Sequence, residues 1–208
     1  MRAFVRVRPA QPHETAGAVN VHDDGRTLTL HKGESSSTVT VDHVLPPTAT
    51  QADVYQAAAA SLIEDVMQGF NATIMAYGQT GAGKTFTLSS THPDTIGIMP
   101  RAAADIFAKA AADVDHDYII HMSYVQIYQE LIQDLLQGPE GGNLQLRETP
   151  EGGVYVEGAR AMEVTGLESC IALLAQGDAQ RHAGETVCGN PKCVFEGNLV
   201  ILVILLAL

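Results

Sequence analysis

The sequence is poor in positive charge. Its 208 residues include 12 Lys and Arg against 24 Asp and Glu, a formal net charge of −12. Because phosphates would be repelled, neither nucleic acid nor an anionic membrane is expected as a general partner, although a local nest of N–H groups can still bind one phosphate ligand. Charged residues make up only 17% of the chain, so it is not a disordered acidic segment. The length suits one domain, or two small ones, with a core that needs no disulfide.

Cysteine is also scarce. Cys170, Cys188 and Cys193 are an odd number and lack the spacing of a zinc site. No second ligand pair accompanies Cys188 and Cys193, and the eight histidines have no metal-binding spacing. We therefore expect reduced thiols in a cytosolic or nuclear protein, no zinc, and a core position for His121, which lies in an apolar stretch.

The sequence has no hydrophobic run of the roughly 20 residues that cross a membrane. The longest run, residues 199–208, is apolar throughout but too short. We expect no element of the fold to be reserved for it, so it could cap an exposed sheet edge or drive association between molecules. Because it is uncharged and rich in β-branched residues, we favour association and regard the segment as an appendage. The opening residues alternate apolar and basic side chains, which indicates a strand rather than a signal peptide.

Segments with strand and helix patterns alternate along the chain, which predicts an α/β fold with a parallel or mixed sheet. Residues 72–77 are almost continuously apolar, as is typical of a strand buried on both faces. A capping-box pattern at Thr50 and Asp53 predicts the start of a helix that ends near Gly69. The other predicted strands are 1–9, 19–21, 27–31, 38–41 and 117–128, with a hairpin from 144–146 and 154–156. The other predicted helices begin at Pro100 and Leu167, and residues 131–136 are predicted to be helical or mixed.

One motif carries the chemistry. The pattern G-x-x-x-x-G-K-[ST] of a P-loop occurs once, in the residues Gly78, Gln79, Thr80, Gly81, Ala82, Gly83, Lys84 and Thr85. In such a loop the glycines let backbone N–H groups surround phosphates, the lysine reaches the β- and γ-phosphates, and the hydroxyl of the last residue coordinates Mg²⁺. The motif predicts a nucleoside triphosphate site with Thr85 as the metal ligand; the alternative is an ordinary glycine-rich turn.

Four further stretches make the interpretation more specific, because together with the loop they resemble the kinesin motor domain. Residues 70–77 lead into the P-loop as they do in that family. The other three stretches are Arg6-Val7-Arg8-Pro9, residues 97–101 with 105–107 (GIMPR and DIF), and residues 123–130 with 134–136 (SYVQIYQE and DLL). The resemblance covers residues 2–186 in register. It implies a P-loop NTPase fold with a central sheet flanked by helices.

The resemblance also implies roles for individual residues. Arg8 and Pro9, together with Arg6, would flank the adenine of ATP, and Phe86 would lie against the base. Residues 79–85 would hold the phosphates and Mg²⁺. The alternatives are an exposed strand position for Arg6 and simple core packing for Phe86. The implied partners are ATP or ADP and microtubules, which would place the protein in the cytoplasm on the cytoskeleton. Residues 157–164 would form either a loop that touches tubulin or a plain surface hairpin.

The resemblance ends near residue 186. There the family continues with an NxxSSRSH-type switch I, whereas this chain has Val187-Cys188-Gly189-Asn190-Pro191, and the DLAGSE-type switch II is not found either. We therefore divide the chain into a partial motor domain, 1–186, and a divergent apolar tail, 187–208. Because neighbours of the P-loop strand would come from the missing part, residues 72–77 are expected to lack pairing partners.

Without switch groups to position water, we expect nucleotide binding but not an active motor, and we assign no catalytic residue. The alternatives are a non-hydrolysing nucleotide-binding fragment and another P-loop NTPase. A small nucleotide kinase is disfavoured by the kinesin-like stretches and by the absence of an Arg-rich lid.

Overall fold

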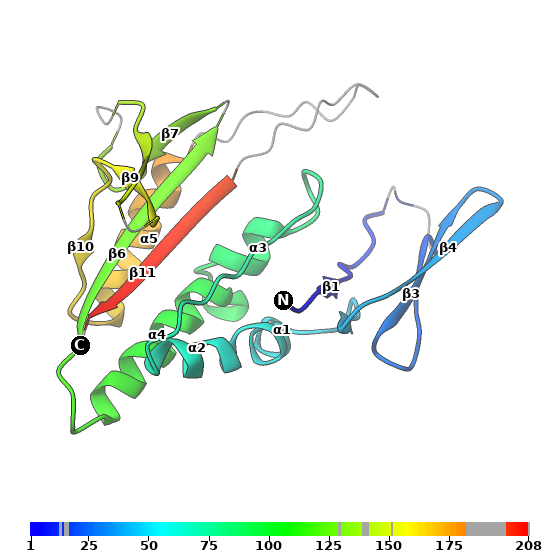
Figure 1. The fold of residues 1–208 in the computed structure, drawn as a ribbon. Coiled ribbons are helices and arrows are strands. Elements are labelled where there is room, and N and C mark those ends of the chain that lie inside the picture. The colour runs from blue at the N-terminus through cyan, green and yellow to red at the C-terminus, as the bar shows by residue number, and fades with distance from the viewer. Residues whose placement is uncertain are drawn as a thin grey trace. The chain divides into compact units, whose positions relative to one another are not determined.

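The computed structural model describes residues 1–12, 14, 17–128, 130–138, 142–150 and 152–181, together with the backbone of 199–207. These residues belong to two compact units, the first comprising Met1–Asp65 and Asn71–Ala102 and the second Val66–Phe70 and Ala103–Leu208 (Figure 1). Each unit combines strands with helices, so the predicted α/β class is confirmed. Among the helices described, none is long and apolar enough to span a membrane.

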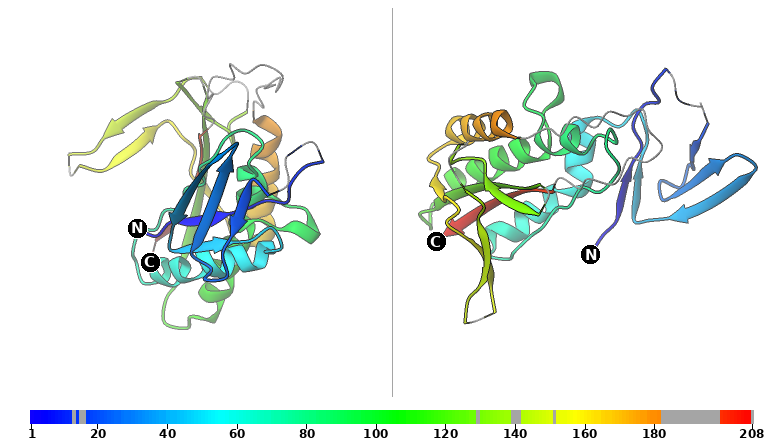
Figure 2. Two further views of the ribbon diagram at one scale, coloured as in Figure 1. Left: turned by 90° about the vertical axis from the view of Figure 1, so that its right-hand side faces the viewer. Right: turned by 90° about the horizontal axis from the view of Figure 1, so that it is seen from above.

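Two small sheets form the β structure of the first unit (Figure 2). Parallel pairing joins β1 (Phe4–Arg6) to β5 (His43–Leu45), and an antiparallel meander contains β2 (Val19–Val21), β3 (Thr27–Lys32) and β4 (Ser35–Thr40). The turn between β2 and β3 is held by Asp24, whose carboxylate accepts hydrogen bonds from the backbone of Arg26 and Thr27 at 2.9 and 2.8 Å. The strands predicted in this region are therefore confirmed.

The predicted helix after Thr50 is present but interrupted. Thr50 and Asp53 form the expected capping box at the start of α1 (Gln51–Ala58). Ala59 then leaves helical geometry at φ −122°, and α2 (Ala60–Met67) follows. The Ala59 side chain is fully buried, and the N–H of Ala59 still bonds to the Tyr55 carbonyl. The sequence pattern did not reveal the interruption, because its apolar spacing continues through it.

The prediction of a doubly buried strand at residues 72–77 is wrong. None of the described strands pairs with this segment, and its side chains are largely open to solvent, with Met75 and Tyr77 exposed by 74% and 85%. A strand is defined by hydrogen bonds to a neighbour, so an apolar run without such a neighbour stays irregular. The missing part of the family's sequence had led us to expect that this segment lacks neighbours, and no strand among the described residues pairs with it.

Helices α3 (Lys84–Ser89) and α4 (Ile98–Ala112) follow, with the short 3₁₀ helix η1 (Pro93–Thr95) between them. Because α4 begins at Ile98, Pro100 occupies its third position instead of the predicted first. Proline is still compatible with this position, since the N–H groups of the first turn have no partner inside the helix.

The sheet of the second unit is built around the long strand β6 (Ile119–Tyr128). Strand β6 pairs antiparallel with β10 (Met162–Glu163), β7 (Leu131–Asp134) and β11 (Leu199–Ala207). Residues 131–134 therefore form a strand that is followed by a turn, so the helical alternative predicted for residues 131–136 is wrong. The predicted hairpin is confirmed as β8 (Gln145–Glu148) with β9 (Val154–Glu157), as is the last helix, α5 (Leu167–Gln180).

Strand β11 corrects the favoured expectation for the apolar tail, that it is an appendage, and agrees with the alternative that it caps a sheet edge. Its backbone pairs with β6 at every position from Leu199, opposite Ile127, to Ala207, opposite Ile119. The fold therefore does offer a partner to this segment, namely one complete edge of β6. The point near residue 186 where the resemblance ends, and both Cys188 and Cys193, lie outside the described residues, so the division at that point stays a prediction.

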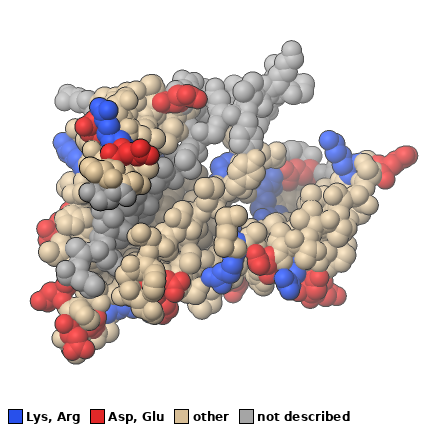
Figure 3. All heavy atoms as spheres, in the orientation of Figure 1, with Lys and Arg blue, Asp and Glu red and all other residues tan. Residues whose placement is uncertain are grey.

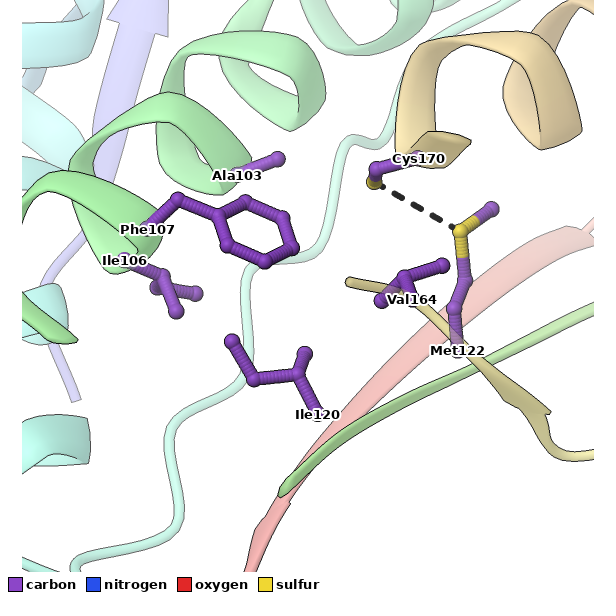
Figure 4. Close-up of a pocket in the computed structure, with 7 residues that line it drawn as sticks. All are labelled: Ala103, Ile106, Phe107, Ile120, Met122, Val164 and Cys170. Atoms are coloured by element: carbon purple, nitrogen blue, oxygen red, sulfur yellow. Dashed lines mark hydrogen bonds between the residues drawn. The ribbon is translucent and has the colours of Figure 1, made fainter. Parts of the chain in front are cut away.

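One face of β6 forms the core of the second unit. Met122 and Tyr124 are fully buried, and the Tyr124 hydroxyl donates to Asp178 of α5. The Cys170 thiol of the same helix lies 3.6 Å from the Met122 sulfur (Figure 4). Helix α4 completes this apolar cluster with the side chains of Ala103, Ile106 and Phe107. His121 points to the opposite face because side chains alternate along a strand, and it is half-buried instead of taking the predicted core position. Burial raises the pKa of the Cys170 thiol to about 11, so this cysteine is a protonated core residue at neutral pH.

Candidate functional site

The loop of residues 78–83 has a backbone that only glycine adopts readily at three positions. Gly78, Gly81 and Gly83 have φ values of 154°, 79° and 96°. A side chain at Gly78 would also be crowded, because its Cβ would lie 3.1 Å from the Cβ of Ala82. The Ala82 N–H closes the turn on the carbonyl of Gln79 at 3.1 Å. The motif's glycines are therefore required by the shape of the loop itself.

Lys84 folds back over this loop from the first residue of α3. Its ammonium donates to the carbonyl oxygens of Gly78 and Gln79 at 2.6 and 3.0 Å. A positive charge is thus held where the chain turns, on the side chain that the motif assigns to phosphate. Thr85 is exposed at the next position of the helix, and Gln79 and Thr80 are exposed within the loop.

Arg6, at the end of β1, reaches the same helix. Its guanidinium donates to the Thr87 hydroxyl at 2.9 Å and lies 5.1 Å from the centre of the Phe86 ring, within cation–π range. Arg6 is partly buried, and this burial lowers the pKa of its guanidinium below the usual value of 12.5. The structure therefore brings Arg6 and Phe86 together beside the P-loop.

Neither alternative for these two residues describes what they do. Arg6 is not simply an exposed strand residue, because it is half-buried and bonded to α3. Phe86 is not a core residue, because 45% of its surface is exposed. In this pair the Arg6 guanidinium lies over the Phe86 ring, while about half of the Phe86 surface stays accessible to solvent.

Arg8 and Pro9 follow a different course. The guanidinium of Arg8 makes two hydrogen bonds to the carboxylate of Glu14 and one to the Pro9 carbonyl, the last at 3.0 Å. The bonded Glu14 carboxylate raises the pKa of Arg8 above its ordinary value. Arg8 is thus held in the loop after β1 by Glu14, whereas Arg6 is held on α3.

Gln51 was not identified from the sequence as part of this region. It is the first residue of α1, only 6% exposed, and its amide bonds to Arg6 and to the carbonyl of Phe86, both at 2.6 Å. Nothing in the motif points to it, since it lies far from the P-loop in the chain. The available signal in the sequence was a polar residue at the predicted start of an apolar helix.

Comparisons with known proteins identify the family of the chain. The kinesin motor domain family matches residues 6–192. The chain is 39% identical over 152 residues to Kinesin-related protein 11 of Dictyostelium discoideum, covering 73% of this chain and 22% of that protein. It is 38% identical over 186 residues to Kinesin-like protein KIN-7N of Arabidopsis thaliana, covering 88% and 22% respectively. The chain thus spans about a fifth of the length of these relatives.

A solved structure described as a fast kinesin superimposes with a TM-score of 0.82 at 26% sequence identity. The superposition covers 99% of this chain and 64% of the other. The resemblance first suggested by the short motifs therefore extends over the fold. This chain belongs to the kinesin motor domain family.

Proposed function

We propose that the chain binds ATP with Mg²⁺ at residues 78–85. The observation that carries the proposal is the conformation of the loop, with three glycines at positive φ and the Lys84 ammonium 2.6 Å from the Gly78 carbonyl. Phosphate oxygens would offer this ammonium stronger acceptors than neutral carbonyls, so Lys84 would turn to the β- and γ-phosphates. The exposed Thr85 hydroxyl supplies the type of oxygen ligand that Mg²⁺ prefers.

The adenine would lie on the Phe86 side of the loop. An exposed aromatic ring backed by a guanidinium provides a flat apolar surface for a purine. Arg8 and Pro9, in the loop that follows β1, would flank the base at its edge. ADP would share this site, because it carries the same base and the phosphate nearest Lys84.

Membership of the kinesin motor family supports a role in a microtubule motor of the cytoplasmic cytoskeleton. The solved relative, a fast kinesin, has been linked to an ATPase mechanism and to interactions with microtubules. Microtubules are strongly acidic, and a net charge of −12 disfavours such a contact. On the face seen in Figure 3, basic side chains are interspersed with acidic ones among the residues described. We therefore propose that this 208-residue polypeptide contributes nucleotide binding and little of the microtubule contact.

Nucleotide binding is tested by titrating the protein with a fluorescent ATP analogue in the presence of Mg²⁺. Lys84→Ala should abolish binding, whereas Lys32→Ala, which removes the same charge from the exposed end of β3, should leave it intact. Chelating Mg²⁺ should weaken binding to the parent and have less effect on Thr85→Ala. Equal affinity of the parent and Lys84→Ala would refute the assignment of the site.

Turnover is a separate question. The residues after Thr186 contain no serine or arginine of the switch I type, so we propose that bound ATP is not hydrolysed at a rate stimulated by microtubules. A phosphate-release assay with and without polymerised tubulin tests this proposal. Clear stimulation would show that other residues of this chain position the attacking water.

A further inference from the structure

Gln51 makes three side-chain hydrogen bonds from a buried position. Its Oε1 accepts from the Arg6 guanidinium at 2.6 Å, and its Nε2 donates to the carbonyl oxygens of Phe86 and Thr95 at 2.6 and 2.9 Å. The partners fix the orientation of the amide, because a guanidinium can only donate and carbonyl oxygens can only accept. In the flipped orientation the amide nitrogen would face the Arg6 guanidinium, donor against donor, and the amide oxygen would face two carbonyl oxygens, acceptor against acceptor.

These bonds hold the Arg6–Phe86 pair from both sides. One bond fixes the guanidinium and another fixes the backbone of the residue that carries the ring. Thr87 supplies a second acceptor for Arg6, but its hydroxyl is on α3 itself and cannot tie that helix to α1. The third bond, to Thr95, anchors the same amide to η1. Gln51 is therefore the side chain that joins β1, α1 and α3 at this point.

We propose that Gln51 is a positioning residue for the base of the nucleotide. It sets the separation of 5.1 Å between Arg6 and the Phe86 ring and thereby fixes the surface on which a purine stacks. Gln51 itself is buried beneath this surface and does not touch the ligand. The inference rests on the proposed function, since it concerns the base half of the same site. It adds that α1, far from the P-loop in sequence, determines how strongly the base contributes to binding.

The experiment separates the base from the phosphates. Affinities for ATP and for inorganic tripolyphosphate, which has no base, are measured for the parent and for Gln51→Leu, a substitution of similar size that makes no hydrogen bonds. The matched control is Gln56→Leu, the same change at an exposed position of α1. Lys84→Ala reports on the phosphate half, so loss of the proposed function is recognised independently.

We expect Gln51→Leu to weaken ATP binding about five- to tenfold, a part of what base stacking contributes. Tripolyphosphate binding should change less than about twofold, a difference that a general loss of stability would not produce. Gln56→Leu should change neither affinity. A folded Gln51→Leu protein with an unchanged ratio of the two affinities would overturn the inference while leaving the P-loop assignment intact.

A second variant covers the case in which Gln51→Leu does not fold and loses both ligands. Gln51→Glu retains an acceptor for Arg6, now with a negative charge that pairs with the guanidinium, and it replaces the donations to Phe86 and Thr95 by a carboxylate oxygen that faces their carbonyl oxygens. We expect it to fold and to lower the ratio of ATP to tripolyphosphate affinity about threefold, because one side of the pair is released. An unchanged ratio in this variant would equally overturn the inference.

Discussion

The P-loop and the core around β6 use glycine for different physical reasons. In the loop, an added Cβ at Gly81 or Gly83 would meet no atom within 4 Å, yet both residues have positive φ. In α5, Gly177 is an ordinary helical residue, but an added Cβ would lie 2.2 Å from Cδ1 of Tyr124. The loop needs glycine for its backbone conformation, and the core needs it for space.

The same contrast applies to the polar groups of the two regions. At the loop they are accessible, and Lys84 and Thr85 can exchange their present surroundings for a ligand. In the core, the Tyr124 hydroxyl donates to Asp178 at 2.7 Å from a fully buried ring. Groups that bind a ligand must be able to change partners, as Lys84 would when it leaves its two loop carbonyls, whereas groups that stabilise a core keep the partners they have. Substitutions should therefore affect binding in one region and stability in the other.

The largest effect should follow from removing β11. Deleting residues 199–208 leaves one edge of β6 without the partner that now pairs with it along nine residues. We expect the free energy of unfolding to fall on the order of 3 kcal/mol or more, with a melting temperature lower by about 6–12 °C and a smaller soluble fraction. Calorimetry measures the stability, and size-exclusion chromatography measures the soluble fraction. A more soluble protein of equal stability would instead restore the view that this segment is an appendage.

Gly177→Ala should destabilise the core by about 3 kcal/mol, because Tyr124 is enclosed and cannot move away from the new methyl group. Gly166→Ala, at the N-cap that precedes the same helix, is the control: its φ of −178° suits any residue and its Cβ would meet no atom within 4 Å. We expect this control to change stability by less than about 1 kcal/mol. Chemical denaturation compares the two. Similar effects in both variants would show that the close approach of α5 to β6 is not tight.

Gly81→Ala tests the loop. Forcing an alanine to a φ of 79° costs about 1–2 kcal/mol, so the loop should adopt a different conformation instead of retaining this one. We expect affinity for the ATP analogue to fall about tenfold while the melting temperature changes by only a few degrees. Undiminished binding would mean that the phosphate site does not depend on the positive φ angles of this loop.

The sequence predicted best those features of the fold that are specified within a few neighbouring residues. The turn at Asp24, the cap at Thr50, the β8–β9 hairpin and the helix start after the glycine-rich turn at residues 78–83 were predicted correctly, because each is specified within a few residues. The nucleotide site at residues 78–85 stays a prediction. The family was predicted for the same reason, from several short stretches in register.

Features that depend on distant partners were predicted less well. Residues 72–77 have the composition of a buried strand, but the pairing that would make them one is not found among the described residues. For residues 199–207, association between molecules was favoured over capping a sheet edge, since no local pattern indicates that β6 would accept them. Gln51 was missed because its role arises from contacts with three other elements. Pairing and buried polar contacts are tertiary properties, which the pattern of one segment does not contain.

Tyr124 predicts a stability change at alkaline pH. Burial, and then its hydrogen bond to Asp178, raise the pKa of this tyrosine above the ordinary value of 10. A raised folded-state pKa contributes stability that is fully present below pH 10 and is lost as the pH rises further. Tyr124→Phe should cost about 1 kcal/mol at neutral pH and reduce the loss above pH 10. Tyr155→Phe, at an exposed position of β9, is the control, and an alkaline transition identical in all three proteins would contradict the assignment.

The smallest effect concerns Asp24 in the β2–β3 turn. Hydrogen bonds from the Thr27 hydroxyl and from the backbone of Arg26 and Thr27 lower the pKa of this carboxylate from 3.8 to about 2. A lowered folded-state pKa contributes stability that is present above about pH 4 and is lost as the pH falls towards 2. An NMR titration should give a midpoint near 2 for Asp24, and the Thr27 amide should lose protection from hydrogen exchange over the same range. In Asp24→Asn this pH dependence should disappear, whereas Asp23→Asn, which removes the neighbouring charge, should leave it unchanged. A midpoint near 4 would show that the turn does not hold the carboxylate, and β2 would then pair with β3 through its strand contacts alone.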